Sequence, residues 1–233
     1  MKKHLPNFIT CLNVLTGAVG IAWVSFFQRG ETAVYFVLAA AVFDFLDGLM
    51  ARLLKVQSEI GKQLDSLADL VSFGVLPAFA LMYLLDNLLS DPFACFSGTD
   101  PLAFSALLII PFSALRLAKF NLATDQSDEF KGLPTPANAL MITAIAFSAP
   151  TFLTVEALLS ITALSCFLLV SNIPMIALKF KSMPWKGNEQ RYSLIILEVI
   201  GLAIFQLSFI PLVIPLYIAV SVVGNLLRKS FIE

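Results

Sequence analysis

Four aspartates, Asp44, Asp47, Asp65 and Asp69, lie within one short window of an otherwise apolar chain. Carboxylates at membrane depth are costly, so ionisable side chains inside spanning segments indicate a functional site. At roughly 100° per residue, the first two aspartates fall on one strip of a helix and the last two share a face of the next helix. Packed together, these faces present carboxylate oxygens, which hard cations such as Mg²⁺ or Mn²⁺ prefer. The spacing predicts a divalent-metal site between two helices.

Small residues accompany the aspartates at Gly48, Ala51 and Gly61. Because they carry almost no side chain, they let a ligand or a neighbouring helix approach closely. A zinc site is excluded, since one His and three scattered Cys lack the spacing of metal ligands. Alternatively, the acidic residues only pair with nearby Lys and Arg side chains across a solvated loop, which would not explain carboxylates on two helix faces.

The surrounding sequence is far more apolar than that of a soluble domain. Of its 233 residues, 58% are hydrophobic and 13% charged, and the mean hydropathy is +0.87. Because a spanning helix needs about 20 mostly apolar residues, we expect one integral membrane domain over residues 1–233, an all-α polytopic bundle of about eight transmembrane helices. The predicted spans are Phe8–Phe27, Thr32–Met50, Leu67–Leu89, Leu102–Ala118, Ala137–Leu153, Ala157–Leu178, Ser193–Leu207 and Phe209–Leu227.

The basic residues indicate an orientation for this bundle. With eight spans, fourteen of the fifteen Lys and Arg residues fall on one side, and only Arg29 falls on the other. Cytoplasmic loops collect basic residues, so both termini and the aspartates are predicted to face the cytoplasm of a bacterial-type inner or plasma membrane. A net charge of −1 without a domain-wide basic footprint argues against nucleic-acid binding.

From Asp44 to Asp69 the residues follow the pattern D-x2-D-G-x2-A-R-x8-G-x3-D-x3-D without departure. This is the signature of the CDP-alcohol phosphatidyltransferase family, which the chain resembles. The resemblance implies transfer of a phosphatidyl group from CDP-diacylglycerol to an alcohol, with two Mg²⁺ or Mn²⁺ ions held by the four aspartates. It also implies that Asp69 accepts the proton of the attacking hydroxyl, and that the protein is a homodimer in the lipid bilayer.

A polar face on the first predicted helix carries Asn7, Thr10 and Asn13 at intervals of three residues. These side chains can point the same way at the cytoplasmic end, so we predict that they line the nucleotide pocket, as the resemblance also implies. Helix capping by Asn7 or Thr10 and interhelical bonding by Asn13 stay open as alternatives.

Further residues predicted to contact the CDP-lipid surround the signature. The guanidinium of Arg52 can reach a pyrophosphate or an aspartate. Ser58 and Lys62 are expected to meet nucleotide or phosphate, although a solvated connector explains them equally well. The predicted set is completed by Gly48, Ala51 and Gly61.

The acceptor is predicted from the segment Arg116-Leu-Ala-Lys119-Phe-Asn121 and the following Gly-Leu-Pro-Thr-Pro-Ala loop. Arg116 and Lys119 lie at the cytoplasmic end of a helix, where they can bind an anion or simply anchor the helix. Both motifs resemble the phosphatidylserine synthase branch of the family. The resemblance implies that Arg116, with Lys119 or Asn121, binds L-serine. It covers roughly residues 6–140, the expected catalytic core with its signature at 44–69, and residues 141–233 add further helices.

Three other functions are compatible with parts of this sequence. Glycerol 3-phosphate as the acceptor would make a phosphatidylglycerophosphate synthase, but its dianionic phosphate needs more Lys and Arg than this segment offers. A membrane transporter or channel also places aspartates in a bundle, yet no second set of Gly/Pro-interrupted helices mirrors the first half. A prenyltransferase would require a second Asp-rich motif.

Overall fold

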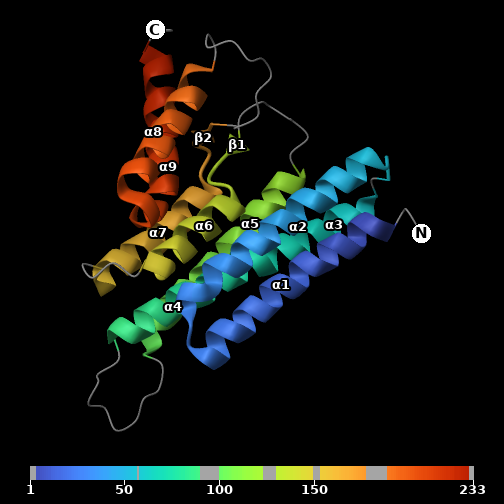
Figure 1. The fold of residues 1–233 in the computed structure, drawn as a ribbon, viewed down its shortest axis with the longest axis horizontal. Helices are drawn as coiled ribbons and strands as arrows, with labels where there is room; N and C mark the ends of the chain where they lie inside the picture. The colour runs from blue at the N-terminus through green and yellow to red at the C-terminus, as the bar shows by residue number, and fades with distance from the viewer. Residues whose placement is uncertain are drawn as a thin grey trace.

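The computed structural model describes residues 4–56, 58–89, 100–122, 130–148, 153–176 and 188–230. Apart from two short strands, its regular structure is helical (Figure 1). The α-helices are α1 Leu5–Phe27, α2 Ala33–Leu53, α3 Glu59–Asp69, α4 Leu76–Leu89, α5 Ile109–Leu122, α6 Thr135–Ser148, α7 Val155–Val170, α8 Glu189–Phe205 and α9 Ile210–Ser230. Shorter helical segments are 3₁₀ turns at Gly30–Thr32, Pro101–Leu108 and Gln206–Phe209 and a π-helical segment at Leu70–Val75, and the strands are β1 Phe130–Lys131 and β2 Pro174–Met175.

Four helical stretches in the described residues are long and apolar enough to cross a membrane: Leu5–Phe27, Gly30–Leu53, Glu59–Leu89 and Pro101–Leu122. Three shorter apolar helices are Thr135–Ser148, Val155–Val170 and Ile210–Gly224. These findings confirm the predicted all-α polytopic membrane bundle. Large apolar side chains such as Phe26 and Phe45 lie exposed on its outside, as lipid-facing residues do.

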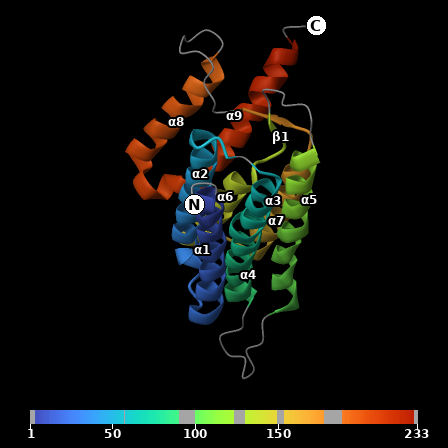
Figure 2. The ribbon, with the colours of Figure 1, turned by 90° about the vertical axis from the view of Figure 1, so that its right-hand side faces the viewer.

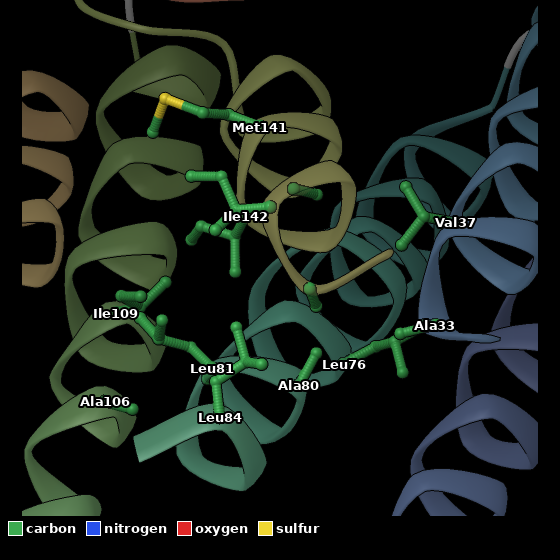
Figure 3. Packing of buried hydrophobic residues seen from close by; sticks show 14 of the residues in the cluster. Ala33, Val37, Leu76, Ala80, Leu81, Leu84, Ala106, Ile109, Met141 and Ile142 are labelled. Atoms are coloured by element: carbon green, nitrogen blue, oxygen red, sulfur yellow. The ribbon is translucent and has the colours of Figure 1, made fainter. Parts of the chain in front are cut away.

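The core lies between α2, α4, α5 and α6, as Figure 3 shows. Alanines let these backbones approach closely, which is how helices pack where lipid removes the hydrophobic driving force. The labelled side chains are Ala33 and Val37 from α2, Leu76, Ala80, Leu81 and Leu84 from α4, Ala106 from the 3₁₀ segment before α5, Ile109 from α5, and Met141 and Ile142 from α6.

The sixth predicted span, Ala157–Leu178, is too long at its C-terminal end. Helix α7 ends at Val170, and Pro174 lies in β2, because the proline fixes its own φ and disfavours helix at the residue before it. Residues 177–178 lie outside the described residues. The third predicted span, Leu67–Leu89, is too short, since the helical stretch already begins at Glu59.

Strand β2 runs antiparallel to β1 and brings the end of α7 against the loop before α6. Gly132 in this loop has φ +75, and its N–H donates to Ile173 O at 2.9 Å. A Cβ there would lie 2.8 Å from Ser171 O, so the close approach requires glycine. Helix α9 packs on α6, and α8 packs on α9 at the edge of the bundle (Figure 2).

Candidate metal and acceptor site

The structure gathers the carboxylates of the signature at the contact between α2 and α3. One carboxylate oxygen each from Asp44, Asp47 and Asp65 lie within 4.8 Å of one another. Asp69 ends α3, and its side chain contacts that of Asp44. All four predicted metal ligands therefore lie side by side, with two coming from each helix.

These carboxylates are not neutralised by the protein. In the described part of the chain, no Lys or Arg side chain lies within 4.0 Å of them as an ion pair. Asp47 Oδ2 and Asp69 Oδ1 are buried and have no hydrogen-bond partner among the residues that the structure describes. Buried, mutually repelling carboxylates are costly unless a cation is bound between them. The oxygen-only cluster therefore fits a divalent metal ion, and the alternative of pairing with nearby basic side chains is not observed.

Local backbone features fix the position of α3 and Asp69. Ser58 caps the helix, since its Oγ accepts a hydrogen bond from Gly61 N at 3.0 Å. Directly after Asp69 the chain winds as a π-helical segment, a feature that changes the direction of side chains and often occurs at functional sites. This segment packs closely on α1, because a Cβ at Gly17 would lie 2.9 Å from Ser72 Cα.

The polar face of α1 lies against the aspartate-bearing helices. Thr10 is next to Asp47, and the Oδ1 atom of Asn7 would lie 3.2 Å from a Cβ placed on Gly61. Asn13 is fully buried, and neither Oδ1 nor Nδ2 of its amide group has a hydrogen-bond partner in the described part of the chain. The structure thus brings all three predicted nucleotide residues to the side of the carboxylate cluster that α1 covers.

The capping and bonding alternatives are partly observed on α1. The Thr10 hydroxyl donates to Pro6 O at 3.0 Å, a bond within its own helix rather than a cap. The Asn13 carbonyl accepts a hydrogen bond from Ser72 Oγ at 3.0 Å, but this contact uses the backbone and leaves the side-chain amide free of protein partners.

The remaining predicted lipid-nucleotide residues differ in their surroundings. Arg52 is exposed and folds back over Gly48, since a Cβ on that glycine would lie 3.6 Å from Arg52 Nη1. Ala51 is half-buried on the same helix. Ser58 is used as the cap of α3, and Lys62 Nζ donates to Asn121 O at 3.3 Å. Within the described residues, Arg52 is therefore the basic side chain of this group that has neither a hydrogen-bond nor an ion-pair partner.

Arg116 on α5 is the predicted acceptor residue that the structure places next to the aspartates. It is only 9% exposed, and its charge interacts with that of Asp69. Its Nη1 donates to Thr135 Oγ1 at 3.4 Å, and its guanidinium lies 6.0 Å from the centre of the Phe120 ring. Its Nε is buried and has no hydrogen-bond partner in the segments described. A guanidinium with unused donors beside a metal cluster can bind an anionic group.

The other two predicted acceptor residues have partners elsewhere. Lys119 is exposed, and its Nζ donates to Val170 O at the end of α7, at 3.4 Å. Asn121 Nδ2 donates to Ser66 Oγ at 2.7 Å, which connects α5 to α3. Both side chains therefore link helices in this structure.

Sequence reasoning missed several buried polar residues near Arg116. They are Ser113 on α5, Thr135 and Asn138 on α6, and Tyr217 on α9. In the sequence, Asn138 could have been recognised as a candidate site residue, because it is an amide in an apolar helix directly after the Gly-Leu-Pro loop. Tyr217, whose hydroxyl donates to Ile176 O at 3.0 Å, carried no signal in the sequence.

Comparison with known proteins gives a family for this arrangement. The family model described as CDP-alcohol phosphatidyltransferase matches residues 3–181. The chain is 38% identical over 140 residues to a CDP-diacylglycerol–serine O-phosphatidyltransferase of Helicobacter pylori, with 59% of this chain and 54% of that protein covered. For the protein of the same description from Mycobacterium leprae, the identity is 33% over 193 residues, which cover 77% of this chain and 60% of the relative.

A third relative with this description, from Saccharomyces cerevisiae, is 34% identical over 159 residues, covering 62% of this chain and 54% of the relative. The matched regions thus span 54–60% of the length of these relatives.

Proposed function

Because the chain belongs to the CDP-alcohol phosphatidyltransferase family, we propose that it transfers the phosphatidyl group of CDP-diacylglycerol to the hydroxyl of L-serine, giving phosphatidylserine and CMP. The observation that carries this proposal is the position of the buried Arg116 beside the four aspartates. Its guanidinium can bind the acceptor, and the adjacent carboxylates can hold the metal that binds the pyrophosphate. The description shared by the relatives supports serine as the acceptor.

Asp44, Asp47, Asp65 and Asp69 would hold Mg²⁺ or Mn²⁺, as a pair of ions in the proposed arrangement. When bound, the metal would neutralise the pyrophosphate and stabilise the charge that develops on CMP as it leaves. Two buried carboxylate oxygens that have no hydrogen-bond partner among the described residues support this role.

The cytidine end of the lipid would bind along α1. Asn7, Thr10 and Asn13 supply amide and hydroxyl groups there, and the small residues Gly48, Ala51 and Gly61 leave room for the ligand. Arg52, with its guanidinium free above Gly48, would bind the pyrophosphate. Ser58 and Lys62 would shape the entrance through their contacts with Gly61 and Asn121.

The acceptor would be oriented by α5. Arg116 would bind the serine carboxylate, and Asp69 would take the proton of the serine hydroxyl as its oxygen attacks the phosphorus and the bond to CMP breaks. Lys119 and Asn121 support this site through the helix contacts described above. The charge interaction between Asp69 and Arg116 supports an acceptor bound between them.

The reaction would occur at the cytoplasmic side of a multi-pass protein in a bacterial-type inner or plasma membrane, since the basic residues of the sequence cluster on that side. Both termini would face the cytoplasm, and the working unit would be a homodimer. Residues 6–140 would form the catalytic core of a single membrane domain.

The test is CMP release from CDP-diacylglycerol by the purified protein with Mg²⁺ or Mn²⁺. L-serine, glycerol 3-phosphate or no alcohol is added in parallel. Release that depends on both metal and serine supports the proposal. Stimulation by glycerol 3-phosphate instead of serine would overturn the acceptor, and absence of metal-dependent release with any alcohol would overturn the reaction.

A further inference from the structure

The first turns of α6 place two polar side chains beside the acceptor end of the site. Thr135 Oγ1 accepts the hydrogen bond from Arg116 Nη1 at 3.4 Å. Asn138 follows three residues later and therefore lies on the same face of α6. Both residues are fully buried. Helix α6 also packs on α2 and on the π-helical segment after Asp69, so this end of the helix adjoins the elements that carry the carboxylates.

Asn138 carries the stronger signal, because neither Oδ1 nor Nδ2 has a hydrogen-bond partner in the described residues. Buried polar groups are nearly always paired, and each unpaired group costs about 1–3 kcal/mol. The other polar side chains further along the helix behave differently: Thr143 Oγ1 donates to Ala139 O at 2.8 Å, and Ser148 Oγ donates to Ala144 O at 3.0 Å. A buried amide that has no partner among the described residues and lies next to the site can form hydrogen bonds with a bound ligand.

The charges around Arg116 indicate what kind of ligand fits. Arg116 is the cation of this cluster and interacts with the carboxylate of Asp69 on its metal side, whereas the described buried polar residues Ser113, Thr135, Asn138 and Tyr217 on the acceptor side of the site are neutral. Lys119 is exposed and bonded to Val170 O. One cation beside neutral oxygens matches a zwitterion, whose carboxylate pairs with the guanidinium while its ammonium donates to hydroxyl and amide oxygens.

We propose that Thr135 and Asn138 bind the α-ammonium group of an amino-acid acceptor and so select a zwitterionic alcohol over anionic ones. This rests on the proposed function, to which it adds the residues that determine specificity. Oγ1 of Thr135 and Oδ1 of Asn138 accept from the ammonium, and Nδ2 of Asn138 is left to donate to the carboxylate. The two side chains position the acceptor and take no part in proton transfer.

The test compares L-serine with 3-hydroxypropionate, which is the same molecule without its amino group. The KM of serine and the inhibition constant of 3-hydroxypropionate are measured by CMP release from the full-length protein and its Asn138→Leu and Thr135→Val variants. Each variant should raise the KM of serine about tenfold or more, which corresponds to the loss of a hydrogen bond to a charged group. The inhibition constant of 3-hydroxypropionate and the KM of CDP-diacylglycerol should stay within twofold.

Two controls separate a ligand contact from a packing defect. Thr143→Val removes a buried hydroxyl from the same helix, where it bonds only to its own helix, and should leave the serine KM unchanged. Arg116→Lys should weaken serine and 3-hydroxypropionate alike, because both carry the carboxylate. If Asn138→Leu does not accumulate as folded protein, Asn138→Ala and Thr135→Val make the same comparison.

An unchanged serine KM in a serine-dependent enzyme would overturn the ammonium site alone, and so would an equal loss of serine and 3-hydroxypropionate in the variants. If the wild-type protein instead responds to glycerol 3-phosphate and not to serine, the proposed function fails and the ammonium site fails with it.

Discussion

The carboxylate cluster and the surroundings of Arg116 are assembled in opposite ways. The cluster comes from two helices that follow each other in the chain, and all its members lie between Asp44 and Asp69. The surroundings of Arg116 combine α5, α6 and α9, with Tyr217 more than one hundred residues beyond Arg116 itself. The metal side is therefore a local product of helix spacing, whereas the acceptor side depends on tertiary packing.

This contrast has a functional meaning. In the proposed reaction, the carboxylate cluster carries out the chemistry that is common to the family. The surroundings of Arg116, which come from distant segments, determine which alcohol is bound. Substitutions in the two halves should therefore produce different kinetic effects, one on turnover with every acceptor and the other on serine alone.

The largest effect is expected for the metal side. Asp44→Asn should lower kcat about 10³-fold or more, because a neutral amide cannot replace a charged ligand that stabilises the transition state. CMP release with saturating serine and CDP-diacylglycerol measures this loss. Glu31→Gln, which removes an exposed carboxylate that pairs with Arg29, is the matched control and should leave kcat unchanged. Wild-type turnover in Asp44→Asn would contradict the proposed role.

The variant Arg116→Lys tests whether the acceptor side affects serine alone. Lysine keeps the charge but loses the planar fork, so kcat/KM for serine should fall about 10- to 100-fold. The KM of CDP-diacylglycerol should stay within twofold, and this split is measured by varying each substrate in turn. Arg29→Lys is the matched control, since that guanidinium is exposed and pairs with Glu31. An equal rise in both KM values would contradict the separation of the two halves.

Gly132→Ala tests whether the loop before α6 holds the residues around Arg116 in position. Its φ of +75 and the 2.8 Å approach of Ser171 O leave no room for a methyl group. We expect a loss of about 1–3 kcal/mol in stability, measured by thermal unfolding in detergent, together with a raised serine KM. Gly48→Ala is the matched control for stability, because its added Cβ would meet nothing closer than 3.6 Å. Unfolding temperatures that fall equally in both variants would contradict this assignment.

The smallest effect is expected for Tyr217→Phe. The variant loses the hydrogen bond to Ile176 O, which is worth about 1 kcal/mol, so the serine KM should rise about two- to fivefold. The metal dependence of CMP release should not change. Tyr35→Phe is the control, since Tyr35 lies exposed on α2. A change in metal dependence with Tyr217→Phe would show that α9 acts on both halves.

Helix spacing made the metal side accessible to sequence reasoning. Intervals of three and four residues place Asp44 with Asp47 and Asp65 with Asp69 in any α-helix, and apolar length predicts the spans themselves. The gathering of all four side chains then needs only that consecutive helices pack together, which they do in most bundles.

The acceptor side could not be predicted in the same way. Nothing local indicates that Lys119 reaches the end of α7 or that Thr135 meets Arg116, because these contacts depend on how separate helices cross. The π-helical segment after Asp69 and the early end of α7 also depend on packing and on Pro174, which a hydropathy window does not resolve.

The pairing of β1 with β2 has a consequence for biosynthesis. Gly132 and Leu133 donate to the carbonyls of Ile173 and Leu168, so the loop before α6 acquires both partners only after the ribosome has synthesised α7 and the segment that follows it. The α2–α3 contact can form much earlier during translation. A nascent chain halted after α6 would therefore carry its four aspartates on two adjacent helices, whereas the loop before α6 would still lack its backbone partners. Membrane-insertion intermediates can be captured at this stage.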